Sequence, residues 1–199
     1  MRIERIRETF DVEVKYTQFP LHPETPAEGM TLEQLFAGRL FDLEAAQARL
    51  TALMAEQGLP YGERTHTYNS RLAQELAKWG ELRPGGEAIH DALFRGYFVD
   101  GVNLAQIDNL VEIAGTVGLS EEKAREVLES RSFSGSVDSD WDRAAELGIT
   151  GVPTFVMNSK GVVGAQPYGV LADLVSGAGA ENRHEGTDSE ATDSLLSDI

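Results

Sequence analysis

The stretch Leu147-Gly148-Ile149-Thr150-Gly151-Val152-Pro153-Thr154-Phe155-Val156-Met157 decides the fold. An amphipathic helical pattern ends at Gly148, and a short apolar run begins after Val152-Pro153. A proline at the first residue of a strand costs no ladder hydrogen bond, and an X-Pro bond is the one peptide bond that readily becomes cis. The stretch therefore predicts a turn from a helix into a strand over 154–157. Its proline is either an ordinary trans residue or part of a cis bend held for contact.

Regular structure is predicted on both sides of this turn. Asn158-Ser159-Lys160-Gly161 has the Asn and Gly of a hairpin turn, and residues 162–164 form the returning strand. Pro167 begins a last helix. Near the start of the chain, residues 1–8 predict the end of a helix, and residues 10–16 alternate apolar and charged side chains as a strand does.

The long middle region is predominantly helical. It opens with a loop that holds Pro20, Pro23 and Pro26, three of the seven prolines. Thr31-Leu32-Glu33-Gln34 fits a capping box and predicts a short helix. Further apolar residues at three-to-four spacing predict five longer helices, which should pack as a compact cluster. Their positions are marked by Leu40 to Met54, by Leu72, Leu76 and Trp79, by Ile89 and Leu93, by Leu104 with Asn103 as cap, and by Val127 with Ser120 as cap.

These patterns divide the chain into three parts. Residues 1–17 and 136–177 form an α/β part, and residues 18–135 are a loop and helical insertion. Residues 178–199 are a polar, acidic tail, which we expect to be disordered because it cannot bury enough surface to offset the entropy of ordering.

Composition excludes several classes of function. A net charge of −16 and a pI of about 4.6 argue against nucleic acid or an anionic membrane as a partner. The absence of cysteine excludes disulfides, thiolate metal sites and cysteine nucleophiles. The four histidines have no metal-ligand spacing, so neither a metal nor a cofactor is predicted. Without a membrane-length apolar run or a secretory signal, the chain is expected in the cytoplasm.

The order of elements and four segments resemble the DsbA family of thioredoxin-fold proteins over roughly residues 1–176. The most similar subgroup is that of the FrnE-like oxidoreductases. The resemblance implies a thioredoxin-like, DsbA-type fold with a large helical insertion. It implies that Pro153 is the cis-proline facing the active site and that Val152, Pro153 and Thr154 bind substrate. The segments are Phe19-Pro20-Leu21-His22-Pro23-Glu24, Tyr68-Asn69-Ser70-Arg71-Leu72-Ala73, Ala92-Leu93-Phe94-Arg95-Gly96-Tyr97-Phe98, and Gly148 to Val156 with Gly164-Ala165-Gln166-Pro167.

One departure from the family pattern concerns the reactive group. Members of the family open with a strand and then place Cys-x-x-Cys at the start of the first helix, where a cysteine of lowered pKa attacks as thiolate. This chain begins inside that helix and has no cysteine. The family activity is disulfide exchange, and this chain offers no candidate catalytic residue for it. We therefore expect an inactive chain, from a truncated gene model or a degenerate fragment.

The missing first strand also bears on partners. In thioredoxin-like sheets it would lie between residues 11–16 and 154–157, so these two segments should not be direct ladder neighbours. Their open edges could allow self-association or accept a strand from a partner. A peptide or a thiol is the expected substrate. Two further functions remain open: a glutathione-dependent isomerase of the same fold, and a non-catalytic peptide-binding protein.

Overall fold

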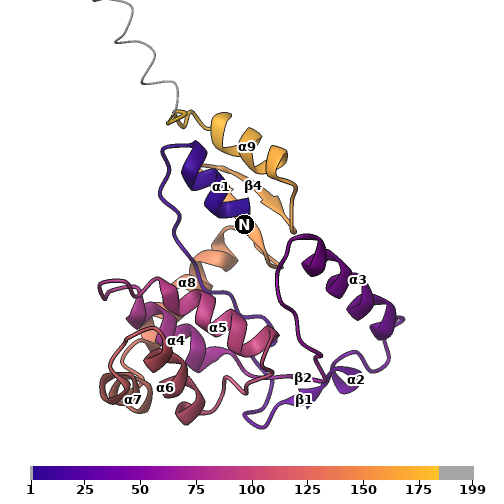
Figure 1. The fold of residues 1–199 in the computed structure, drawn as a ribbon, viewed down its shortest axis with the longest axis vertical. Coiled ribbons are helices and arrows are strands. Elements are labelled where there is room, and N and C mark those ends of the chain that lie inside the picture. Colours follow the sequence, from indigo (N-terminus) through magenta and orange to yellow (C-terminus); the bar gives the residue numbers. More distant parts are fainter. Residues whose placement is uncertain (1, 184–199) are drawn as a thin grey trace, which may run out of the picture. The chain divides into compact units, whose positions relative to one another are not determined.

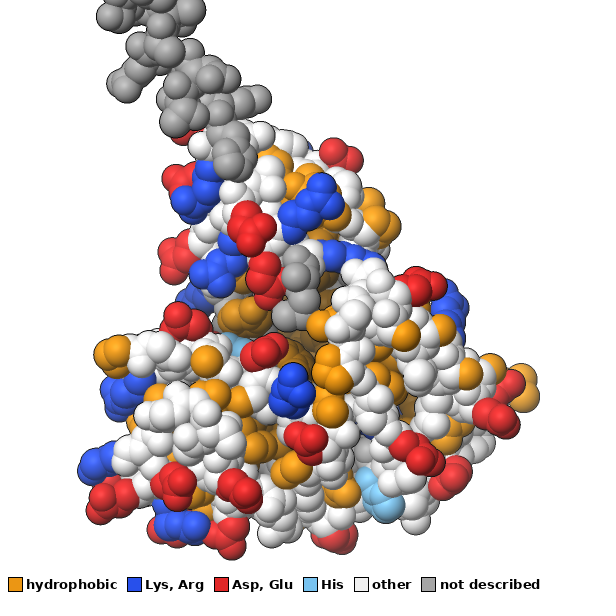
Figure 2. All heavy atoms as spheres, in the orientation of Figure 1, with side chains coloured by type: hydrophobic (Ala, Val, Ile, Leu, Met, Phe, Trp, Pro, Cys, Tyr) orange, Lys and Arg blue, Asp and Glu red, His pale blue; other side chains and the backbone are white. Residues whose placement is uncertain are grey.

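The computed structural model describes residues 2–183, and these residues form two compact units (Figure 1). Unit 1 contains the residues up to Thr17 and those from Ala144 onward, and unit 2 is Gln18–Arg143. In the described part of the chain, no helix is both long and apolar enough to cross a membrane. Figure 2 shows acidic side chains spread over the visible face with basic ones between them, consistent with the net charge of −16.

Unit 1 is built from two helices and a β-hairpin. The two strands pair antiparallel, with Thr154 opposite Val163 and Met157 opposite Lys160. Asn158 in the turn has a φ of 55°, a left-handed conformation that asparagine tolerates better than most residues. The predicted hairpin is present, but its turn is confined to Asn158 and Ser159 and its returning strand begins at Lys160, two residues earlier than predicted. The elements are α1 (Arg2–Thr9), β3 (Thr154–Met157), β4 (Lys160–Val163) and α9 (Tyr168–Ser176).

The two faces of this hairpin are covered unequally. On one face, Phe155, Met157 and Val162 pack against a core formed by α1, α9 and the residue that follows α1. On the other face, Val156 is 43% exposed and Val163 is 63% exposed. The core residues are Ile6, Phe10, Leu171 and Val175.

The predicted strand over residues 10–16 is wrong. Residues 11–16 have no regular secondary structure, the Val12 N–H donates back to the Phe10 carbonyl at 3.0 Å, and the one β-bridge of the segment within the described chain joins Phe10 to Asn182. A strand needs a neighbour for its N–H and C=O groups, and no neighbouring strand is present among residues 2–183. The side chains still alternate in exposure as the sequence pattern predicts, because Val12 and Val14 are half-buried while Glu13 is exposed. In the same part of the chain, β3 pairs with β4 alone.

Unit 2 contains the predicted helical cluster. Its largest apolar side chains with no exposed surface are Leu76, Ile89, Leu110, Leu128 and Val137. The α8 helix begins in unit 2 and ends in unit 1, and the predicted boundary between 135 and 136 falls inside it. The helices are α4 (Arg71–Gly80), α5 (Ala88–Phe98), α6 (Ile107–Thr116), α7 (Glu121–Ser130) and α8 (Ser134–Glu146).

Local capping explains where several helices begin. The capping box is present at α2 (Leu32–Leu35): the Gln34 N–H donates to Thr31 Oγ1 at 3.1 Å, and the Thr31 N–H donates to Gln34 Oε1 at 2.9 Å. Ser120 caps α7, as predicted. Asn103 does not cap α6, because that helix begins four residues later and the Asn103 Oδ1 instead accepts the N–H of Ala105 in a local turn.

One predicted helix lies apart from the cluster. The α3 helix (Leu43–Glu56) buries no side chain, and Leu53 is 45% exposed. Its half-buried residues include Ala46 and Gln47, and the Gln47 side-chain amide donates to the Arg64 carbonyl at 2.7 Å. The segments that precede and follow α2 and α3 pair with each other in a two-residue antiparallel ladder. Its strands are β1 (Met30–Thr31) and β2 (His66–Thr67).

The predicted tail spans residues 178–199, and the part from residue 184 onward lies outside the described residues. Its first residues run beside the end of α1. The Arg183 N–H donates to the Thr9 carbonyl at 2.9 Å, and the Arg183 guanidinium forms an ion pair with Asp11 at 2.9 Å.

Candidate functional site

The loop that carries the candidate site starts from a well-defined helix end. After α8, Gly148 has a φ of 66°, which glycine adopts without steric cost. The Gly148 N–H donates to the Ala145 carbonyl and the Ile149 N–H to the Ala144 carbonyl, both at 2.9 Å. These two bonds close the helix in the Schellman manner. The predicted helix end near Gly148 is confirmed.

The three predicted substrate-binding residues follow directly. The Val152–Pro153 peptide bond is cis, and the Pro153 carbonyl accepts the Gly164 N–H at 2.8 Å. The Thr154 hydroxyl donates to the Gly151 carbonyl at 2.7 Å. Val152 is 49% exposed and Pro153 is also exposed, whereas Thr154 is half-buried. The structure thus places a firmly held apolar surface at the start of β3.

This surface carries no reactive side chain. A valine side chain, a proline ring and a hydroxyl already bonded to a carbonyl supply no titratable group and no activated nucleophile. The sequence has no cysteine from which a thiolate could come. The loop can contact an extended chain through its apolar side chains and its backbone. It has no group of its own for proton or electron transfer.

A residue that the sequence did not point to supports the far side of the loop. The Arg2 guanidinium donates to the carbonyls of Ala165 and Gln166, both at 3.1 Å. The Gln166 side chain donates in turn to the Val163 carbonyl at 2.5 Å. More than 160 residues separate Arg2 from these carbonyls, and no local pattern marks such a contact.

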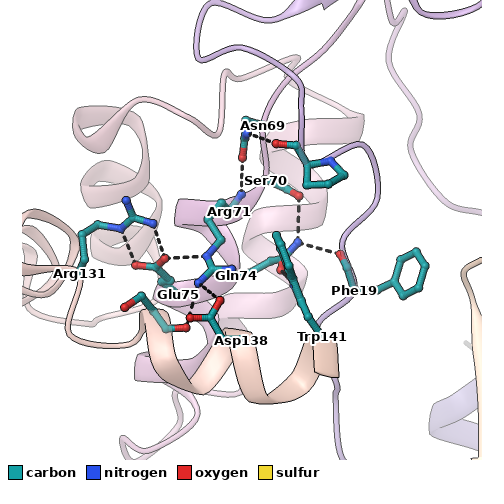
Figure 3. A network of polar contacts seen from close by, with 11 residues as sticks. Phe19, Asn69, Ser70, Arg71, Gln74, Glu75, Arg131, Asp138 and Trp141 are labelled. Carbon is teal, nitrogen blue, oxygen red and sulfur yellow. Dashed lines mark hydrogen bonds and ion pairs between the residues drawn. The ribbon is translucent and has the colours of Figure 1, made fainter. Parts of the chain in front are cut away.

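Two of the sequence segments that carried the family resemblance meet in unit 2 (Figure 3). The Asn69 side-chain amide donates to the Pro23 carbonyl at 3.0 Å and to the Thr25 carbonyl at 2.8 Å. The Gln74 amide donates to the Phe19 carbonyl at 3.0 Å. The proline-rich loop is thereby fixed to the start of α4, and Asn69 has the structural role that its place before a helix favours.

Beside this contact lies a buried carboxylate (Figure 3). Glu75 has no exposed surface, and it accepts bonds from Arg71 Nε at 2.9 Å and from Arg131 Nη2 at 2.6 Å. Arg71 also donates to Asp138 at 2.7 Å. The hydrogen bond to Glu75 raises the pKa of Arg131 above its usual value. The network ties α4 to α8 and to Arg131, the residue that follows α7.

The three histidines among residues 2–183 belong to no metal-binding group. Within residues 2–183 no group of three or more histidine or acidic side chains could hold a metal ion. His90 contacts Glu81 at 2.7 Å, and His66 stacks on Tyr68 with ring centroids 6.0 Å apart. His22 lies in the proline-rich loop, and His184 lies outside the described residues.

Comparison with known proteins gives a consistent match. The family model described as "DSBA-like thioredoxin domain" matches residues 1–176. The uncharacterized protein YwbO of Bacillus subtilis (strain 168) is 26% identical over 172 residues, which cover 83% of this chain and 82% of YwbO. The crystal structure of probable DsbA oxidoreductase SCO1869 from Streptomyces coelicolor is 32% identical. It superimposes with a TM-score of 0.81 and covers 89% of this chain and 81% of that one.

Proposed function

The chain belongs to the DSBA-like thioredoxin domain family, and from this premise we propose that it binds an extended peptide or thiol substrate at Val152, Pro153 and Thr154. Membership confirms the predicted thioredoxin-like fold with its helical insertion. The observation that carries the proposal is the exposed loop that presents Val152 and Pro153 at the start of β3. Placement in the FrnE-like subgroup is part of the proposal.

We also propose that these 199 residues do not exchange disulfides on their own. Thiol–disulfide exchange proceeds by attack of a thiolate on a disulfide sulfur, and the sequence contains no thiol. A similar structure bears the name of a probable DsbA oxidoreductase, but that activity requires a group that this chain lacks. Peptide binding without redox chemistry is the function that the remaining groups support. The isomerase alternative and the cytoplasmic location stay predictions from the sequence.

The absence of redox turnover is directly testable. In an insulin-reduction assay driven by dithiothreitol, the chain should give the same rate of turbidity increase as dithiothreitol alone. A DsbA-type protein with an intact Cys-x-x-Cys, run in parallel, provides the positive control. A catalysed rate from the purified chain would contradict the proposal.

Substrate binding is testable at Val152. We expect Val152→Asp to weaken binding of a fluorescein-labelled, carboxymethylated insulin B chain by about tenfold, about 1.4 kcal/mol, because a carboxylate would replace an apolar contact. Fluorescence anisotropy measures the affinity. Leu82→Asp is the matched control, since Leu82 is 66% exposed in unit 2, and it should bind like the unmodified protein. Equal affinities of the two variants would place the peptide elsewhere.

A further inference from the structure

A surface groove of about 580 Å³ is lined by residues of α5, of α6 and of the loop between them, in the helical cluster of unit 2 (Figure 1). All of its lining residues lie between 88 and 117, so the groove belongs to one compact unit. Sites for small molecules in proteins have volumes of roughly 300–1,000 Å³. The size of this groove therefore suits a small ligand.

The sequence of α5 explains why the groove is hollow. Ala88, Ala92 and Gly96 follow one another at four-residue spacing, which places them on one face of the helix, and all three line the groove. Their side chains are too small to fill the space. At Gly96 an added Cβ would lie 2.9 Å from Ile113 Cδ1, and Ile113 is 8% exposed in the same lining. The groove thus has an apolar floor.

The charged groups of the lining are mostly carboxylates. Asp91 on α5, Asp100 after it and Glu112 on α6 are all exposed, and none of them forms an ion pair within residues 2–183. Arg95 supplies one guanidinium, so the described lining carries a net charge of 1 − 3 = −2. The groove therefore favours a cation.

The neutral polar groups of the lining can only accept further hydrogen bonds. The Asn109 amide already donates to the Asn103 carbonyl at 2.9 Å, and its Oδ1 remains as an acceptor. The Thr116 hydroxyl donates its one hydrogen to the Ile113 carbonyl at 2.7 Å. A ligand must therefore bring N–H donors, and an alkylammonium group carries donors and no acceptor.

The carboxylates are spread along the groove. No group of three or more acidic or histidine side chains among residues 2–183 could hold a metal ion, so these carboxylates do not converge on one point. Asp91 and the last residue of α5, Phe98, are about 10 Å apart along the helix axis at the usual rise per residue, and Asp100 follows two residues later. An elongated cation with charges at intervals fits this spacing better than a single ion does.

We infer that the groove between α5 and α6 binds a free aliphatic polyamine. Its methylene groups cover the apolar floor while its ammonium groups reach the carboxylates, as the stem and head of a lysine side chain do at protein surfaces. The net charge of −16 raises the local concentration of such a cation. Lysine side chains of another protein carry the same chemistry, but the volume is that of a small-molecule site. This binding goes beyond the proposed function, which rests on Val152 and Pro153.

The test titrates the full chain with spermidine in a calorimeter. The salt concentration is near physiological, so that distant charges are screened over about 8 Å. We expect saturable binding of one spermidine per chain. Heat without saturation, or the absence of binding, would overturn the inference.

Three variants separate this site from diffuse attraction. Asp91→Asn and Glu112→Gln should each weaken spermidine binding at least fivefold, and both should fold because these side chains are exposed and outside any ion pair in the described chain. Glu33→Gln removes the same charge from an exposed position on α2, outside the groove, and should stay within twofold. Equal losses in all three variants would overturn the inference by showing adsorption to an acidic protein.

A matched pair at Thr116 tests the groove from within. Thr116 is exposed in the lining, so Thr116→Lys places a cation among the carboxylates without burying it. We expect this variant to bind spermidine at least tenfold more weakly, whereas Thr116→Gln keeps an acceptor and should stay within twofold. Unchanged affinity of Thr116→Lys would place the polyamine elsewhere.

Two other cations of the same charge test the chemical class of the ligand. Hexaamminecobalt(III) carries N–H donors but no carbon chain, and it should bind at least tenfold more weakly than spermidine. Equal affinity would overturn the role of the apolar floor. A trilysine peptide blocked at both ends should also bind at least tenfold more weakly, because its backbone does not enter the groove. Equal affinity of that peptide would assign the groove to lysine side chains of a partner protein instead.

Discussion

Replacing Glu75 with alanine should lower the free energy of unfolding by about 3–5 kcal/mol, as expected when one member of a buried ion pair is removed. Glu75 has no exposed surface and accepts hydrogen bonds from both Arg71 and Arg131. The variant would leave Arg71, whose side chain is 17% exposed, without its most buried carboxylate partner. Urea unfolding followed by tryptophan fluorescence reports on unit 2, because Trp79 and Trp141 both lie there.

Asp138 provides the matched control for this network. Its side chain is 61% exposed and contacts the same Arg71 at 2.7 Å. Exposed ion pairs contribute little, so Asp138→Ala should cost no more than about 1 kcal/mol. Similar losses for Glu75→Ala and Asp138→Ala would contradict the view that burial makes the Glu75 pairing important.

Substituting Gly86 with alanine should cost about 3 kcal/mol in the same unfolding measurement, at the upper end of overpacking effects. Gly86 is buried in the turn between α4 and α5, and its N–H donates to the Arg83 carbonyl at 2.9 Å. An added Cβ would fall on the carbonyl oxygen of Gly80 and within 2.7 Å of the carbonyl carbon. Because the obstacle is backbone, the turn itself would have to shift.

Gly135 provides a control in which alanine should raise the free energy of unfolding instead of lowering it. It lies in the first turn of α8, and an added Cβ would meet no heavy atom within 4 Å. Gly135→Ala should therefore raise the free energy of unfolding, by about 0.5 kcal/mol, because alanine loses less backbone entropy on folding. A loss of stability in both variants would mean that the effect at Gly86 is not steric.

The features that the sequence predicts well are those with local causes. The capping box at Thr31, the cap at Ser120 and the glycine at 148 each act on backbone groups within a few residues. The hairpin after β3 follows in the same way from Asn158, which takes a left-handed conformation in the turn, whereas Gly161 lies in β4 opposite Val156. The Val-Pro pair that opens β3 is also a local pattern, but it left cis and trans proline open, and the substrate-binding role of Val152, Pro153 and Thr154 is what the family resemblance implies.

The features that the sequence does not predict depend on distant residues. The alternation over 10–16 reports which side chains face inward, but a ladder needs a second strand, and the described chain has none beside it. In the sequence, nothing distinguishes Glu75 from other charged residues of an amphipathic helix. Its burial depends on Arg131, which is 56 residues away. Arg2 supports the loop near Gln166 through a contact that only the fold creates.

The isolation of α3 has a consequence for how this protein can change over evolutionary time. Because the helix buries no side chain, most substitutions on its surface should leave the stability of the fold nearly unchanged. Selection for folding alone would let Leu50 and Leu53, which are 37% and 45% exposed, drift to polar residues. Retention of these two leucines among close homologues would therefore record a selective pressure other than folding.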